Sequence, residues 1–307
     1  LRAYRWYDIQ IGDRIAQVFG IPPDPKEHAC TMTDVLLRRI TMNCYDLSES
    51  SMKAYVEIIN KFRPKAIVGF ASAVDLFARY VKEKAVCIAK PKVIIATGEM
   101  LFPDQREHIA DAFECVVFDF YGSREILSIA SECPEHVGYH LSMENLFLEL
   151  ARDGEHVSPG EIGAVIVTDL QNFAMPFIRY ENGDLARPSD ETCSCGRGLS
   201  LIGSLEGRTS DIIVLPEGRF LSTPGFTYVF KDVPADWYQV VQETRTKILI
   251  RILKNENFLE KDANLIVERI RKYVGNVDID LTFVKSRPSS GVGKWRVVVS
   301  KVPVKFS

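Results

Sequence analysis

The chain has 307 residues, of which 46% are hydrophobic and 26% charged, as expected for a globular protein with a sizeable core and more than one domain. Its formal charge of −3 provides no basic field for a phosphate backbone, so we expect no nucleic-acid partner. No apolar stretch reaches the roughly 18–20 residues that a membrane span needs, and residues 1–8 show no signal-peptide pattern. Seven cysteines, an odd number, indicate a reducing, cytoplasmic compartment with some thiols assigned to a metal.

Helices and strands alternate over the first two thirds of the chain. Residues 48–62 begin with a Ser cap and place apolar side chains on one helical stripe, namely Met52, Tyr55, Ile58, Ile59 and Phe62. The same reading predicts helices at 72–84 and 103–113, and strands at 66–70, 92–96 and 115–122. This order predicts an α/β fold with a parallel or mixed sheet and function at the strand ends.

The pattern changes after Tyr139, where short strands separated by Gly- and Pro-containing turns are predicted at 147–151, 164–170 and 177–180. Beyond residue 211 the pattern predicts strands at 237–244, 247–253 and 277–285, and a helix at 265–275. A unit of about 100 residues is enough for a small α+β domain. We place the boundary at Gly207–Ser210, which gives a large domain over 1–207 and a mobile C-terminal domain over 208–307.

Two loops at predicted strand ends carry polar residues. In YGSRE (121–125), the turn can present the ring of Tyr121 for stacking and the carboxylate of Glu125 as an oxygen ligand, the kind that Mg²⁺ favours. The triplet TGE (97–99) follows the preceding predicted strand. For both loops, the plain alternative is a strand-end turn with solvated charge.

A second pair of segments carries charge beside glycine. In ENGDLA (181–186), the turn dipeptide Asn182-Gly183 projects Asp184, whose carboxylate can accept two hydrogen bonds at once, as a ribose diol requires. The alternative is a hairpin turn with an acidic residue. EGRTSD (206–211) marks the start of the C-terminal region.

The segment SSGVGKWR (289–296) is not a phosphate-binding P-loop, because Pro288 and Trp295 stand where that motif needs Gly and Ser or Thr. A flexible loop that delivers Lys294 fits better, since an amine there can neutralise charge between a carboxylate and an α-phosphate. The alternative is an ordinary exposed lysine.

The metal signal comes from two turn-like segments, one offering Cys133, His136 and His140 and the other Cys193 and Cys195. Four such ligands suit tetrahedral Zn²⁺, and a closed set implies a structural role. The alternative is a group of buried free thiols. We expect the other cysteines, Cys30, Cys44, Cys87 and Cys115, to lie in the core.

Taken together, these signals resemble the adenylate-forming (acyl-CoA synthetase-like) superfamily, with the phenylacetate–CoA ligase group and its capsule-biosynthesis relatives as the most similar branch. The resemblance implies ATP-dependent activation of a carboxylic acid to an acyl-adenylate, with transfer to CoA or an amine. It implies catalytic roles for Lys294 and for Glu125 through Mg²⁺, and favours His140 over His136 as zinc ligand. The ATP/AMP-binding residues that it implies are Thr97, Gly98, Glu99, Tyr121, Gly122, Ser123, Arg124, Asp184 and Arg208. Within this set, Tyr121 stacks on adenine, while Asp184 and Arg208 hold the ribose.

The chain departs from the family pattern at three points. Arg124 replaces the usual Ser or Thr, and Ser210 occupies the hinge pivot that is usually Asp or Lys. The phosphate loop TSGTTGxP does not occur in the sequence. In relatives it lies upstream of a segment like residues 4–20, where a basic helix leads to a Gly-Asp turn and a strand. A fragment, an ordered remnant of a longer chain and a protein that lost ATP turnover each explain this, and the start at Leu1 favours the first two.

Two other hypotheses compete with the enzyme. The first is a nucleotide-sensing or partner-binding protein that keeps the fold without turnover. The second is a zinc-ribbon nucleic-acid module, which the lack of a basic patch disfavours. Within the enzyme hypothesis, Phe118 and Phe120 beside Tyr121 suggest an apolar or aryl acid, and core packing explains them equally well. A homodimer is compatible with the sequence.

Overall fold

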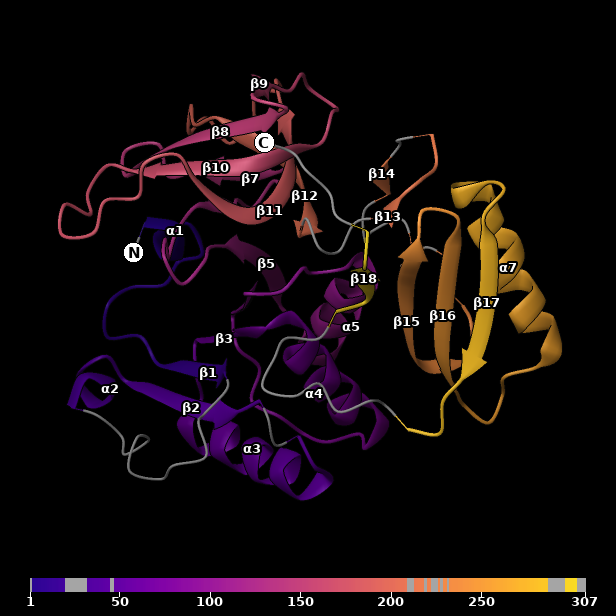
Figure 1. Cartoon of the computed structure of the whole chain (residues 1–307). Helices are drawn as coiled ribbons and strands as arrows, with labels where there is room; N and C mark the ends of the chain where they lie inside the picture. Colours follow the sequence, from indigo (N-terminus) through magenta and orange to yellow (C-terminus); the bar gives the residue numbers. More distant parts are fainter. Residues whose placement is uncertain are drawn as a thin grey trace. The chain divides into compact units, whose positions relative to one another are not determined.

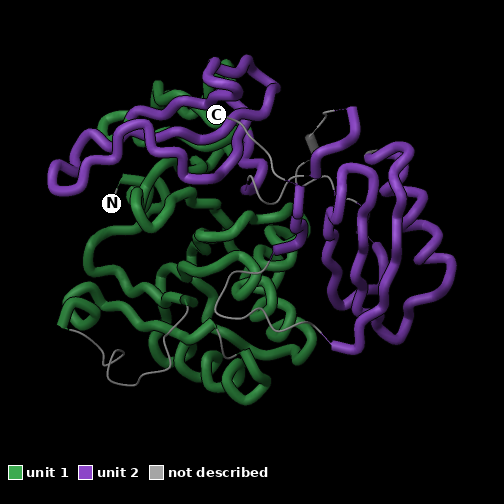
Figure 2. Tube along the Cα trace, viewed as in Figure 1, with its two compact units in different colours: residues 1–146, 189–203 green, residues 147–188, 204–307 purple. Residues whose placement is uncertain are grey.

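The computed structural model describes residues 2–19, 32–44, 47–208, 213–217, 220–221, 226, 229–230, 232–286 and 296–302 (Figure 1). The chain divides into two compact units (Figure 2). Unit 1 comprises residues 1–146 and 189–203, and unit 2 comprises residues 147–188 and 204–307. None of the described helices combines the length and the apolar character that crossing a bilayer requires.

Unit 1 is built on a mixed sheet. Its parallel part has the order β2 (Arg39–Asn43), β1 (Ile15–Phe19), β3 (Ala66–Phe70), β4 (Val93–Thr97) and β5 (Val116–Tyr121). The sheet then continues antiparallel through β6 (Ala130–Glu132) and β7 (Tyr139–Leu141) to the first residues of β12 (Leu201–Arg208). The predicted mixed sheet is therefore confirmed. The expected helix, Gly-Asp turn and strand near the N-terminus correspond to α1 (Arg2–Trp6), Gly12 with φ 92°, and β1.

The two faces of this sheet are covered differently because side chains alternate along each strand. Ile67, Ile94 and Val117 share one core with α3 (Glu49–Phe62), α4 (Ala71–Glu83) and α5 (Pro103–Phe113). Their neighbours Val68, Ile95 and Phe118 pack on the other face against Ala3, Tyr7 and Ile9. A further short helix, α2 (Met32–Leu36), precedes β2.

Helix α3 begins as predicted, since the Ser48 hydroxyl accepts the Ser51 N–H at 3.4 Å. The predicted apolar stripe was wrong at Ile58, which is 42% exposed. Met52, Val56 and Ile59 are the buried positions, spaced four and three residues apart as one helical face requires.

Unit 2 contains a first group of strands in the order β12, β11 (Tyr180–Ser189), β10 (Gly163–Asp169), β8 (Leu146–Arg152) and β9 (Glu155–His156). Strand β10 pairs antiparallel with β11, and β8 with β9. The strand predicted at 177–180 was wrong except at Tyr180. Arg179 has φ 46°, which an extended strand cannot accommodate, and Asp169 starts a loop by accepting the N–H groups of Gln171 and Asn172.

A bulge replaces the predicted turn at Asn182-Gly183. Both residues lie inside β11, where the register against β10 shifts between Ala164 and Ile166. The N–H of Asp184 donates to Oδ1 of Asn182 at 3.0 Å, and Gly183 takes φ 79°. The dipeptide therefore forms a local kink within a strand rather than the end of a hairpin.

The remainder of unit 2 has its own sheet, in the order β17 (Asp278–Phe283), β16 (Lys247–Lys254), β15 (Ala235–Thr244) and β18 (Val298–Ser300). Helix α7 (Glu260–Val274) packs with it, and β13 (Ile213–Val214) pairs with β14 (Phe220–Leu221). The helix predicted from residue 265 begins five residues earlier, where the Asp262 carboxylate accepts the N–H of Leu259 at 2.8 Å. The exact domain boundary at 207/208 stays a prediction, and the pivot Ser210 lies outside the described residues.

Candidate metal centre and nucleotide-binding loops

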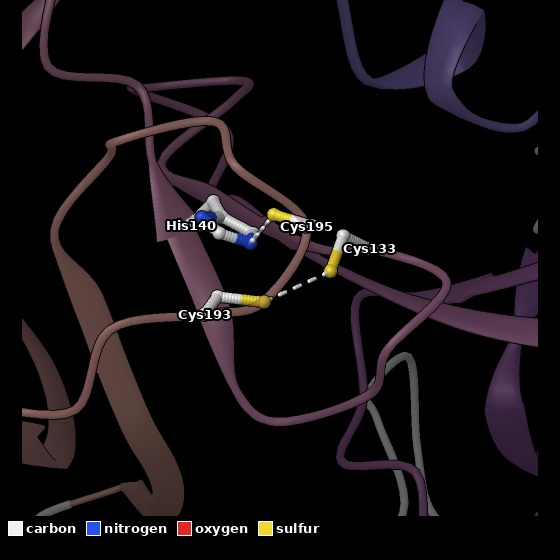
Figure 3. A group of neighbouring side chains, drawn as sticks. All are labelled: Cys133, His140, Cys193 and Cys195. Carbon is white, nitrogen blue, oxygen red and sulfur yellow. Dashed lines mark hydrogen bonds between the residues drawn. The ribbon is translucent and has the colours of Figure 1, made fainter.

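Four side chains of unit 1 converge on one point, Cys133, His140, Cys193 and Cys195 (Figure 3). Their candidate ligand atoms all lie within 4.8 Å of one another. The Sγ atoms of Cys133 and Cys193 are 3.6 Å apart, and Sγ of Cys195 is 3.3 Å from Nε2 of His140. These are the four residues that the sequence suggested as zinc ligands.

Strand pairing brings the four together from segments about 60 residues apart in sequence. Cys133 directly follows β6, and His140 lies in β7, opposite Leu201 of β12. The loop between β6 and β7 needs Gly138, because a Cβ there would lie 2.6 Å from the carbonyl oxygen of Ile202. Gly196, with φ 72°, turns the chain just after Cys195.

The pKa values of the ionisable groups in the cluster are shifted in different directions. Burial and the nearby charge of Arg197 lower the pKa of His140, which keeps the imidazole neutral. Burial raises the pKa of Cys133 to about 11. Burial acts in the same direction on Cys195, but hydrogen bonds from the backbone and side chain of Arg197 and from neighbouring thiols outweigh it and lower the pKa of Cys195 to about 7. Neutral histidine and thiolate are the forms that bind Zn²⁺. His140 and Cys195 are therefore suited to a metal, whereas the Cys133 thiol would have to lose its proton on binding.

His136 is engaged elsewhere, although the sequence left it as an alternative ligand. Its Nδ1 lies 3.3 Å from Oε2 of Glu132 and 3.3 Å from Arg106, and its ring stacks on Phe118. Trp6 from α1 instead packs against the cluster, with its ring centroid 5.6 Å from that of His140. The Arg197 guanidinium lies 4.7 Å from the Trp6 ring centroid. The geometry therefore places His140 with the three cysteines.

The YGSRE loop is held by its own backbone. Tyr121 ends β5 and is buried, and the N–H of Ser123 donates to the carbonyl of Ile126 at 2.9 Å. The Ser123 hydroxyl accepts the N–H of Ile126 at 3.1 Å. Gly122 is required here, since a Cβ would lie 2.2 Å from the Leu127 carbonyl oxygen. Arg124 and Glu125 are exposed at the tip.

The TGE triplet lies at the end of β4, the strand next to β5. Thr97 is opposite Phe120 in the parallel register, and its hydroxyl donates to the Phe120 carbonyl at 2.7 Å. Gly98 has φ 72°. Oε2 of Glu99 accepts the N–H of Ser72 in the first turn of α4 at 3.0 Å. The two predicted nucleotide-binding loops therefore meet at the carboxyl ends of adjacent parallel strands, as expected for this kind of sheet.

The predicted ribose residues lie in unit 2. Nε of Arg208, at the end of β12, is 3.3 Å from Oδ1 of Asp184 in the bulge of β11. The Asp184 side chain is 16% exposed and that of Arg208 56% exposed. Lys294 lies outside the described residues.

A buried polar network in unit 1 escaped the sequence analysis. The Tyr139 hydroxyl donates to Oδ2 of Asp119 at 2.8 Å, and Oε2 of Glu132 accepts the Asp119 N–H at 2.7 Å. Arg106 donates to the other Glu132 oxygen at 2.7 Å. Burial, together with the charge of Glu132, raises the pKa of Asp119 to about 7. The sign of this network in the sequence was Asp119, a single acidic residue in the otherwise apolar strand 116–121.

Comparison with known proteins places the chain. The CapK C-terminal domain family matches residues 213–301. Protein CapK of Staphylococcus aureus is 22% identical over 275 residues, covering 87% of this chain and 59% of that protein. A phenylacetate–coenzyme A ligase of Thermus thermophilus is 26% identical over 181 residues, covering 57% of this chain and 41% of that ligase. These similarities support the resemblance to the adenylate-forming superfamily, in the CapK and phenylacetate–CoA ligase branch.

Solved structures of adenylate-forming enzymes share the fold. A 2-hydroxyisobutyryl-CoA ligase in complex with 2-HIB-AMP superposes with a TM-score of 0.78 at 17% identity, covering 98% of this chain and 68% of that one. The amide bond synthetase McbA of Marinactinospora thermotolerans gives 0.66 at 14% identity, covering 90% and 58%. The predicted fold class, a large sheet domain with a smaller C-terminal α+β domain, is confirmed.

Proposed function

We propose that this chain forms the adenosine-binding and C-terminal parts of a ligase that activates a carboxylic acid with ATP. The acid would form an acyl-adenylate with release of pyrophosphate, and the acyl group would then pass to CoA or to an amine. The pairing of Asp184 with Arg208 carries the proposal, because the two residues that the resemblance assigns to one ribose come from different motifs and lie 3.3 Å apart.

Each part of the nucleotide has a proposed partner. Tyr121 would stack on adenine beside the wall formed by residues 97–99, and the paired Asp184 and Arg208 would hold the ribose hydroxyls. Exposed at the loop tip, Glu125 would supply a carboxylate to Mg²⁺. Lys294 would neutralise negative charge where the carboxylate attacks the α-phosphate. The adjacent β4 and β5 loops support the adenine part of this assignment.

The chain spans 59% of the length of CapK and 41% of the length of the Thermus ligase. The whole reaction is therefore proposed for the protein to which these residues belong. Phe118 does not argue for an aryl acid, because its buried ring stacks on Tyr7 with centroids 4.0 Å apart. A panel of aliphatic and aryl acids is needed to identify the class of acid that is activated.

The metal cluster has a structural role in this proposal. Zn²⁺ would be held by Cys133, His140, Cys193 and Cys195, where it would tie β6 and β7 to the turn that precedes β12. Trp6 packs against the cluster, and four protein side chains are enough for a tetrahedral site without a water ligand. Such a staple would keep the strands that follow the YGSRE loop in register.

Carboxylate-dependent ATP–pyrophosphate exchange, screened over an acid panel, tests the proposed activation. Calorimetry measures AMP binding to the same protein in parallel. Lys294→Ala should reduce exchange by about 100-fold or more while AMP still binds, and exposed Lys285→Ala serves as the matched control. AMP binding without exchange on any acid would support a nucleotide-binding protein instead. If the protein neither binds AMP nor catalyses exchange, the proposal is refuted.

A further inference from the structure

Gln242 lies on strand β15 of unit 2 and is completely buried, with 0% of its surface exposed. Its side-chain amide contacts two segments, β13 and β18, that come after the hinge and after the Lys294 loop in the sequence. Oε1 accepts the N–H of Val214 at 2.9 Å, and Nε2 donates to the Val214 carbonyl at 2.7 Å. Oε1 also accepts the Ser300 hydroxyl at 2.8 Å. The side-chain amide of Gln242 thus bonds to both the N–H and the carbonyl of Val214, as the backbone of a neighbouring strand would.

The two partners lie on different strands, and each strand follows a proposed moving part. Val214 belongs to β13, which follows the hinge segment that includes Ser210. Ser300 belongs to β18, which follows the loop that carries Lys294 and pairs in parallel register with β15. Figure 1 shows β13 and β18 beside β15.

Strand β15 also contacts the residues that follow the Lys294 loop at several other points. Nε2 of Gln239 donates to the Arg296 carbonyl at 3.1 Å, and the Val240 N–H donates to the Val297 carbonyl at 2.8 Å. The Gln242 carbonyl accepts the N–H of Lys301 at 2.9 Å. Only Gln242, among these described contacts, also reaches β13.

Val214 extends the connection toward the proposed ribose site. Its side chain packs in one cluster with Ile162, Ala164 and Leu185, and Val302 joins them. Leu185 is the residue after Asp184 in β11.

We propose that Gln242 is a positioning residue that holds the chain leaving the hinge and the chain leaving the lysine loop in one fixed register. The inference rests on the proposed function. With both segments fixed to one strand, β13 and β18 move as a single body. A lysine delivered from a fixed base reaches the α-phosphate in fewer orientations, and such restriction is a recognised source of rate.

Gln242→Met tests this directly, because methionine keeps a similar volume and removes all three side-chain hydrogen bonds. We expect kcat for exchange to fall about tenfold or more, while the Kd for AMP stays within about twofold. Gln242→Glu keeps the acceptor for Ser300 and should recover part of the rate. Ile270→Val, a mild change in the buried core of the same sheet and helix, controls for lost stability.

Amide hydrogen exchange provides a readout that does not depend on activity. Gln242→Met should lose protection at 213–214 and 298–300 together, and Ile270→Val should not. If only one of these strands loses protection, or neither does, the inference is wrong. A folded Gln242→Met protein with wild-type kcat also refutes it.

The outcomes separate this inference from the proposed function. If the wild-type protein shows no exchange, the proposed activation fails, and the hydrogen-exchange comparison still decides whether Gln242 couples the two strands. If Gln242→Met does not fold, Ser300→Ala removes a single hydrogen bond and takes its place. That variant should lower kcat about two- to threefold and reduce protection at 298–300; unchanged values would overturn the proposal.

Discussion

Nε of Arg208 lies 3.3 Å from Oδ1 of Asp184, which joins the end of β12 to the bulge in β11. The bulge turns Asp184 out of the regular ladder, because Asn182 accepts its N–H and Gly183 takes a left-handed conformation. A regular strand would aim residue 184 according to strict alternation. The local irregularity therefore serves the pair that we propose as the ribose contact.

Asp184→Ala should weaken AMP binding by about 10- to 100-fold, since hydrogen bonds to a charged group contribute about 1.5–3 kcal/mol. Arg208→Ala should act in the same direction, and the double variant should lose less than the sum because the two groups touch. Calorimetry with AMP and 2′-deoxy-AMP gives the measurement. Exposed Glu181→Ala, on the same strand, is the control. Wild-type affinity in Asp184→Ala would remove this residue from the site.

The metal centre predicts about one zinc per chain by elemental analysis. Cys193→Ser should lose the metal and lower the free energy of unfolding by several kcal/mol, because the remaining ligands no longer close the site. Cys87 was expected in the core, but its thiol is exposed, so Cys87→Ser should keep both metal and stability. A stable wild-type protein that contains no zinc would contradict the assignment.

Asp119 predicts a pH dependence of stability. Burial raises its pKa from 3.8 to about 7 in the folded protein, so the folded state holds a proton that the unfolded chain releases between about pH 4 and 7. Stability from this group is therefore present at low pH and is lost as the pH rises through that window. Asp119→Asn should lack this loss, so its stability relative to wild type should increase from pH 5 to pH 8.

Urea unfolding at both pH values, with zinc in excess, measures the difference for Asp119. Exposed Asp153→Asn should follow the wild-type pH profile. A constant offset between Asp119→Asn and wild type across the window would show that Asp119 is ionised throughout.

Gly122→Ala should deform the YGSRE turn, because the new Cβ would meet the Leu127 carbonyl oxygen at 2.2 Å. We expect a loss of about 1–3 kcal/mol in stability and a clear loss of AMP affinity. Gly12→Ala, where φ is 92° and the surrounding space is open, controls for an ordinary glycine replacement. Thermal unfolding and AMP calorimetry report the two effects, and unchanged AMP binding in Gly122→Ala would separate this turn from the nucleotide site.

Local patterns predicted the regular elements well. Helix 103–113 and strand 66–70 were predicted at their observed bounds, because their periodicity and punctuating residues act within a few positions. The strand at 177–180 and the turn at Asn182-Gly183 were assigned incorrectly. Pairing with β10 decides the conformation of that segment, and no pattern within residues 177–184 encodes its partner.

The motifs of the sequence were enough to recognise a resemblance to the superfamily and its branch, and the cysteine and histidine spacing, with that resemblance, was enough to name the four candidate zinc ligands. The pairing of β6 with β7 separated His140 from His136, and it buried Glu132 next to Asp119. Folding also brought Gln242 between β13 and β18. These relationships join segments far apart in the chain. Burial and hydrogen bonding between such segments arise only in the folded tertiary structure, which brings them together.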